Sequence, residues 1–107
     1  MIYTGTTPTI TLNFSEDVDF SLGSSFAVTF SYPVSEKVIL EKTDEDLEIG
    51  EHTVGVFLTQ EETLKFPKGS VMVQLNWLYQ DGAKTRRACS VKKAIYWDSN
   101  LKKEVMQ

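Results

Sequence analysis

The strongest constraint on the fold is a run of alternating apolar residues that ends at a turn signal. In extended backbone, every second side chain projects from the same face of the strand. Five large apolar side chains share one face in this way: Val71, Val73, Leu75, Trp77 and Tyr79. Asp81-Gly82 follows the run, and such a dipeptide accepts the positive φ of a tight hairpin turn. Because a face this apolar needs a covering layer, residues 70–91 predict a β-hairpin packed against another sheet.

The return strand of this hairpin can pair in two registers. A strict two-residue turn at Asp81-Gly82 places the polar side of the return strand, including Ser90, on the apolar face. One more loop residue, or a β-bulge, places Cys89 and Val91 there instead. Burying these two side chains stabilises the fold by roughly 2 to 4 kcal/mol, so we predict the three-residue loop or the bulge. Cys89 is then a small buried hydrophobic residue.

Alternation also predicts the other strands, which are short and separated by turn residues. They lie at residues 9–14, 26–32, 37–42, 52–58 and around 94–97. In the polar loop 15–25, a shorter alternation of Val18, Phe20 and Leu22 forms either an edge strand or a segment folded back onto the core. The acidic stretch 43–51 is predicted to be a connection between strands.

One segment carries a helical signal. The Thr59 hydroxyl can accept a hydrogen bond from the Glu62 amide, and the Glu62 carboxylate can reach back to Thr59, which is the pattern of a capping box. Pro67 and Gly69 then end the helix. We predict a short helical crossover near residues 60–65 that carries the chain from one sheet to the other.

Together these elements predict an all-β fold. About seven strands, turn signals every 8 to 12 residues and almost no helix are typical of an antiparallel β-sandwich. The architecture is immunoglobulin-like, although the paired cysteines of antibody domains are absent; a small closed barrel is the alternative. Residues 1–107 are expected to form a single domain. Residues 101–107 add either a last edge strand or a frayed tail.

Charge and hydropathy exclude several classes of partner. A net charge of −4 without a basic stripe disfavours nucleic acid, and the small basic clusters 86–87 and 92–93 are interpreted as solvated positions. The N-terminal residues lack the basic and continuous apolar regions of a signal peptide. No run approaches the roughly 18 apolar residues that span a membrane. We therefore expect neither nucleic-acid binding nor membrane insertion.

Residues that could support catalysis or metal binding are few. His52 and Cys89 are the only histidine and the only cysteine, so they provide too few ligands for zinc and exclude an internal disulfide. As a nucleophile, Cys89 would need His52 as its base, and no strand-to-helix elbow accompanies either residue. The acidic clusters 16–19 and 44–48 lack the glycine and glutamate spacing of a calcium loop. We predict no catalytic, cofactor or metal site.

Aromatic residues near the end of the chain suggest a surface for contacts. Tyr96 and Trp97 are adjacent on a predicted strand, so they must face opposite sides of the sheet. One of the two is expected to be exposed. We predict that Tyr96 and Trp97 mark a contact surface.

Four motifs occur in an order that resembles a known group of proteins. They are GTTPTITLNF, VILEKTDEDLEI, LTQEETLKF and VMVQLNWLYQDG, and together they cover roughly residues 5–97. The chain resembles small prophage-encoded proteins of Gram-positive bacteria, which are similar to the N-terminal domain of baseplate upper proteins of tailed phages. LTQEETLKF, which follows an alternating strand, is the most specific motif. The resemblance implies a fold and a setting in phage tails, and it carries over no catalytic residue.

These observations predict a non-enzymatic structural protein of a phage or prophage tail or baseplate. Its partners would be other tail proteins or further copies of itself, reached by edge-strand pairing or through an aromatic patch. We expect it in the virion or in the host cytoplasm. Because the sequence lacks the large receptor-facing extension of full baseplate proteins, we do not expect receptor binding. The alternative is a small module that binds carbohydrate through Tyr96 or Trp97.

Overall fold

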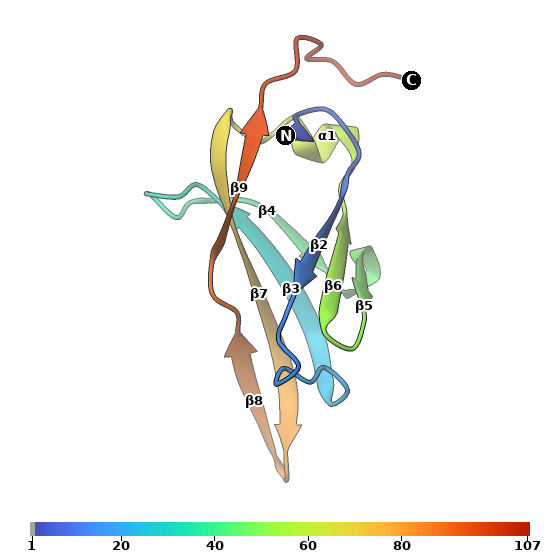
Figure 1. The fold of residues 1–107 in the computed structure, drawn as a ribbon, viewed down its shortest axis with the longest axis vertical. Coiled ribbons are helices and arrows are strands. Elements are labelled where there is room, and N and C mark those ends of the chain that lie inside the picture. Colours follow the sequence, from blue (N-terminus) through green and yellow to red (C-terminus); the bar gives the residue numbers. More distant parts are fainter. Residues whose placement is uncertain (1) are drawn as a thin grey trace.

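The structure, a computed structural model, describes residues 2–107 and has the predicted all-β fold (Figure 1). Two sheets face each other and curl into a half-barrel. The strands are β1 (Ile2–Tyr3), β2 (Thr9–Asn13), β3 (Gly23–Ser31), β4 (Val38–Thr43), β5 (Leu47–Ile49), β6 (Thr53–Phe57), β7 (Gly69–Asp81), β8 (Lys84–Cys89) and β9 (Lys93–Asp98). The helical elements are a 3-10 turn, η1 (Asp44–Asp46), and a short helix, α1 (Gln60–Thr63). The two-residue β1, and β5 within the expected acidic connection, are strands that the sequence did not predict.

β7 organises the larger of the two sheets. That sheet has six strands in the order β1-β9-β7-β3-β4, with β8 also paired to β7. The first half of β7 pairs with β9, and its second half, from Asn76 onward, pairs with β8. The smaller sheet has the order β2-β6-β5. All pairings are antiparallel except the one between β1 and β9.

The core lies between the two sheets, where the alternating apolar residues meet. The expected inward positions of β2, β3, β6 and the first half of β7 are buried, which confirms the period-two interpretation. The largest fully buried side chains include Phe30, Val54, Val56, Leu58, Val71, Leu75 and Trp97. Phe20 folds back from the loop before β3 and packs edge-on against Phe14, Phe26 and Trp77 at ring-centroid distances of 5.2, 5.5 and 5.2 Å.

The return strand of the central hairpin has a different register from the predicted one. Asp81 pairs with Lys84 across a two-residue turn in which Gly82 has a φ of +63°, as the first central residue of a type II′ turn requires. Cys89 pairs with Asn76, so its side chain lies on the outer face, where it is exposed. Val91 is also exposed, and the predicted burial of both residues is wrong.

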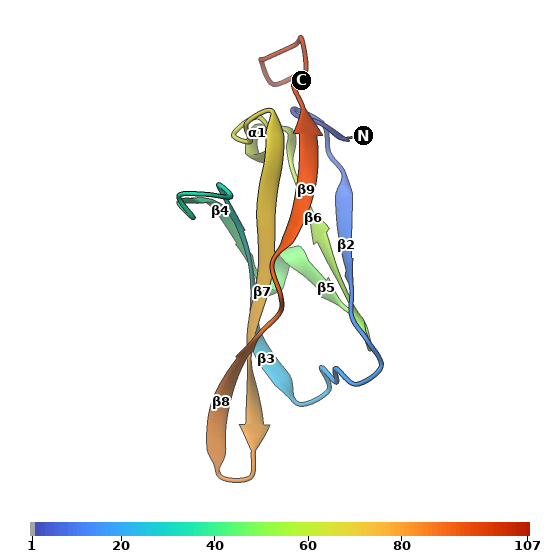
Figure 2. The same cartoon turned by 60° about the vertical axis from the view of Figure 1, so that its left-hand side comes forward.

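The physical reason is visible in both ribbon views, where the β7–β8 hairpin extends beyond the smaller sheet (Figures 1 and 2). No covering layer lies over the end of this hairpin. Burial therefore offers no gain that could insert an extra loop residue or a bulge, and the turn geometry sets the register.

The crossover between the sheets matches its prediction. The Glu62 amide donates to Thr59 Oγ1 over 3.2 Å, and the Thr59 amide donates to Glu62 Oε1 over 2.9 Å, which completes the capping box at the start of α1. The chain passes from β6 of the smaller sheet through α1 to β7 of the larger one. None of the helices within residues 2–107 is both long enough and apolar enough to cross a membrane.

Lys42 links this crossover to the edge of the larger sheet. Its side chain points inward from β4 and is buried, and Nζ lies 2.7 Å from each carboxylate oxygen of Glu62. Burial raises the pKa of the Glu62 carboxyl, but hydrogen bonds from Lys42 and Thr59 outweigh burial and hold the pKa below its ordinary value of 4.5. The ion pair is therefore present at neutral pH.

Replacing Lys42 by methionine should destabilise the fold, because Glu62 would keep its charge without its partner. Removal of one partner from a buried pair costs about 3 to 5 kcal/mol, and the partial exposure of Glu62 reduces the expected loss of unfolding free energy to about 2 to 3 kcal/mol. Denaturant unfolding measures this loss. Lys37→Met, at an exposed position, is the matched control and should change stability by less than about 0.5 kcal/mol. Equal stability of the two variants would contradict the assigned role of Lys42.

The same pair should make stability sensitive to acid. Because the folded-state pKa of Glu62 lies below its unfolded value, its stabilising effect is complete above about pH 4.5 and is lost as the pH falls through the folded-state pKa. Glu62→Gln keeps a side chain that can complete the capping box but removes the charge. Its unfolding free energy should fall less than that of the wild type between about pH 5 and about pH 3. Glu61→Gln, next to it and exposed, should retain the wild-type slope.

Candidate functional site

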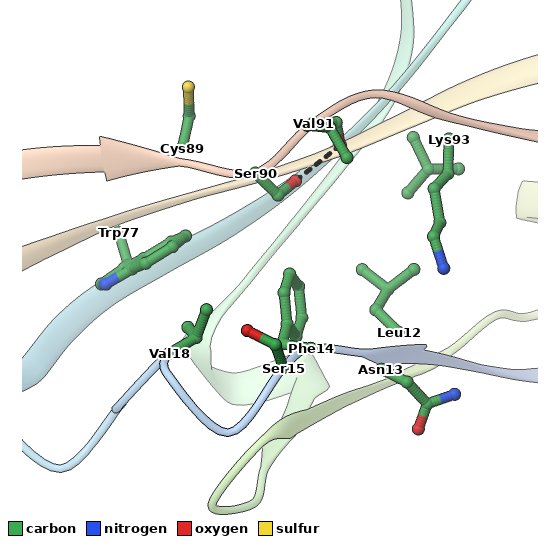
Figure 3. Close-up of a pocket in the computed structure, with 11 residues that line it drawn as sticks. Leu12, Asn13, Phe14, Ser15, Val18, Trp77, Cys89, Ser90, Val91 and Lys93 are labelled. Carbon is green, nitrogen blue, oxygen red and sulfur yellow. Dashed lines mark hydrogen bonds between the residues drawn. The ribbon is translucent and has the colours of Figure 1, made fainter.

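An apolar groove opens along the side of the half-barrel, between β2 with its following loop and the β8–β9 connection (Figure 3). Its volume is about 390 Å³. The side chains that matter most for its chemistry are Leu12, Phe14, Val18, Val73, Trp77 and Lys93. In the close-up, Phe14, Leu12 and Trp77 point toward the gap, whereas Cys89 and Asn13 point away from it.

The groove lies on the side of the half-barrel where β2 is the edge strand of the smaller sheet. β1 pairs with β9 at Trp97 and Asp98, after which the chain crosses to the smaller sheet and becomes β2. Below that crossing, no strand joins β2 to the larger sheet. Ser90 fixes the opposite side of the groove, since its amide donates to the Leu75 carbonyl and its hydroxyl accepts from the Leu75 amide.

β2 presents an unpaired edge along this groove. Phe14 N donates to the His52 carbonyl, and Leu58 N donates to the Pro8 carbonyl. The even-numbered residues of β2 therefore direct their backbone N–H and C=O groups toward β6. In an antiparallel ladder the alternate residues direct their backbone groups the other way. The free N–H and C=O groups are those of Thr9, Thr11 and Asn13. The groove is lined by the last two residues of β2, Leu12 and Asn13, and by no residue of β6, so the free edge borders the groove at this end of the strand.

Lys93 is the charged residue among those that line the groove. Lys93 pairs in register with buried Val73, which places its exposed side chain on the groove side of β9. No carboxylate among the described residues forms an ion pair with it. The groove thus combines an apolar floor with an unpaired ammonium at its mouth.

The two aromatic residues predicted to form a contact surface lie on opposite faces, as expected. Tyr96 is 48% exposed on the outer face of the larger sheet. Trp97 is fully buried against Phe66, with a ring-centroid distance of 4.6 Å, and its Nε1 has no hydrogen-bond partner in the described structure. Trp97 therefore cannot contact a partner directly. The contact role of Tyr96 stays a prediction.

His52 and Cys89 occupy separate environments. His52 Nδ1 lies 2.8 Å from the Val18 carbonyl oxygen and fastens the loop after β2 to the start of β6. Cys89 lies on the outer face of the hairpin. Within residues 2–107, no group of three or more histidine, cysteine, aspartate or glutamate side chains could hold a metal ion.

The sequence analysis did not predict the groove, although part of its lining can be inferred from the sequence. The alternation of Val18, Phe20 and Leu22 left open an edge strand or a return to the core, and the structure shows that Val18 and Phe20 return to the core while Leu22 is exposed. The run from Val71 to Trp77 supplied the opposite wall. The free edge of β2 could not be predicted from the sequence, because the pairing partners of a strand depend on the whole topology. No family model, curated protein or solved structure matches this chain, so its function has to be inferred from the groove and the edge themselves.

The position of Cys89 predicts its reactivity. An exposed thiol on the outer face should react with the disulfide reagent DTNB in the native protein and release one equivalent of chromophore. The register predicted from the sequence would bury the thiol and delay the reaction until the protein unfolds. The total thiol measured in denaturant is the control. Reaction only in denaturant would contradict the observed register of β8.

Proposed function

We propose that this protein is a non-enzymatic assembly protein that binds an extended segment of another chain along β2. One observation carries the proposal: the unpaired edge of β2 lies directly beside the apolar groove. An edge strand offers backbone donors and acceptors in the spacing of an added strand, and an adjacent apolar groove accepts alternate side chains of that strand. The backbone groups of Thr9, Thr11 and Asn13 would make the ladder.

The energetics favour a segment with apolar residues at alternate positions. Burial of two aliphatic side chains in the groove contributes roughly 3 to 6 kcal/mol. The entropy lost when an extended segment is ordered offsets much of this gain. Side chains therefore provide selectivity, while the backbone ladder fixes direction and register.

The setting of this assembly follows from the resemblance to prophage-encoded proteins. We propose a phage or prophage tail or baseplate as the assembly, and other tail proteins or further copies of the chain as partners. The immunoglobulin-like arrangement belongs to the same proposal and is supported by the two facing, mainly antiparallel sheets. The carbohydrate-binding alternative has less support, because Trp97 is buried and leaves only Tyr96 of its two aromatic residues exposed.

The test uses a substitution that removes one outward N–H and leaves the β6 ladder intact. Thr11→Pro meets this condition, because proline is tolerated on edge strands where its nitrogen faces away from the ladder. Thr11→Val keeps the N–H and is the matched control. Peptides selected for binding from a random library displayed on yeast should favour alternating apolar residues. They should bind Thr11→Pro about tenfold more weakly than the wild type or Thr11→Val.

Thermal unfolding by circular dichroism establishes that both variants remain folded. If the library yields no binding peptides, or if the selected peptides bind folded Thr11→Pro as well as the wild type, strand addition at β2 is wrong.

A further inference from the structure

We infer that the extended segment bound along β2 is residues 101–107 of a second copy of this chain, an inference that rests on the proposed function. The observations that carry it are a segment with exposed apolar side chains, a groove with an unpaired ammonium, and one pair of opposite charges, Glu104 of the segment and Lys93 of the groove.

Residues 101–107 extend away from the two sheets after β9 (Figure 1) and form no helix or strand. Three of their side chains are large, apolar and exposed: Leu101 at 97%, Val105 at 45% and Met106 at 66%. Apolar side chains grouped on an exposed segment are a common mark of a protein contact. In extended backbone, Met106 faces one side of the segment, and Leu101 and Val105 face the other.

Met106 hydrogen-bonds through both of its backbone groups to one side chain of α1. The Met106 amide donates to Gln60 Oε1 over 2.8 Å, and Gln60 Nε2 donates to the Met106 carbonyl over 3.1 Å. One flexible, surface side chain therefore satisfies both backbone groups of Met106. A strand edge offers the same donor and acceptor in a longer ladder, so the segment can exchange this contact for β2 of a second copy.

The side chains of the segment match the groove in order. In extended backbone, Glu104 and Met106 face the same side, about 7 Å apart. With Glu104 beside the Lys93 ammonium, Met106 lies over the apolar floor at Phe14 and Trp77, and the segment runs parallel to β2. Among residues 2–107, the ion pair of Glu104 is with Lys102, at 3.9 Å and in solvent, a contact of little stabilising value.

We infer a second copy as the occupant because every copy of the chain presents both this groove and this segment. Reciprocal exchange between two copies gives a closed dimer, and one-way donation gives a ring or a filament. Either arrangement covers Met106 of one copy with the groove of another. Return of the segment to its own groove would leave the protein monomeric.

The experiment measures molar mass by light scattering after size exclusion, over a dilution series of the full chain. The wild type should exceed the monomer mass and dissociate on dilution. Met106→Asp places a charge on the apolar floor and should give a monomer, whereas Met106→Leu should behave as the wild type. Lys93→Glu should weaken association about tenfold, and the double variant Lys93→Glu/Glu104→Lys should restore it. A monomeric wild type, or association that survives in Met106→Asp, overturns the inference.

A synthetic peptide of sequence SNLKKEVMQ, corresponding to residues 99–107, separates this inference from the proposed function. It should bind the full-length Met106→Asp variant and fail to bind Met106→Asp/Thr11→Pro. If Thr11→Pro weakens the binding of the library peptides but the synthetic peptide does not bind at all, only the identity of the segment is wrong. If neither binds, strand addition along β2 is wrong as well.

Discussion

β7 is much longer than the layer that covers it, and this mismatch determines most of the structure. Its thirteen residues span about 43 Å, whereas the five-residue strands β2 and β6 span about 17 Å. Where the two layers overlap, Val71, Val73 and Leu75 are buried and the fold has its core. Beyond the overlap, β7 continues with β8 as an uncovered hairpin. The groove lies at the boundary between these two parts, where Trp77 is only partly buried.

Specific side-chain contacts close the end of the molecule that carries α1, whereas the groove at the side of the half-barrel stays open. Phe66 follows α1 and packs between Phe30 and Trp97, with ring-centroid distances of 5.3 and 4.6 Å. The Lys42–Glu62 pair ties α1 to β4. Replacement of such a buried pair by apolar residues is often neutral or stabilising in proteins. We interpret the role of the Lys42–Glu62 pair as fixing the position of the crossover helix α1 against β4.

Local signals predicted the local features of this fold. Alternation located the main strands and their buried faces, and the Thr59–Glu62 pattern gave the capping box in detail. Both depend on residues within a few positions of one another. The register of β8, and with it the exposure of Cys89, depends instead on where the second layer ends. That boundary is set by contacts between distant segments. The same limit applies to the free edge of β2 and to the choice of Trp97 over Tyr96 as the core residue.

The open edge of β2 is also a liability, because an unpaired strand accepts many extended chains. The outward side chains of β2 are threonine and asparagine, which makes the edge less apolar but does not close it. If β2 binds an extended segment as we propose, a newly made chain must meet that segment before it meets other unfolded polypeptide. Synthesis close to the partner would then protect the edge.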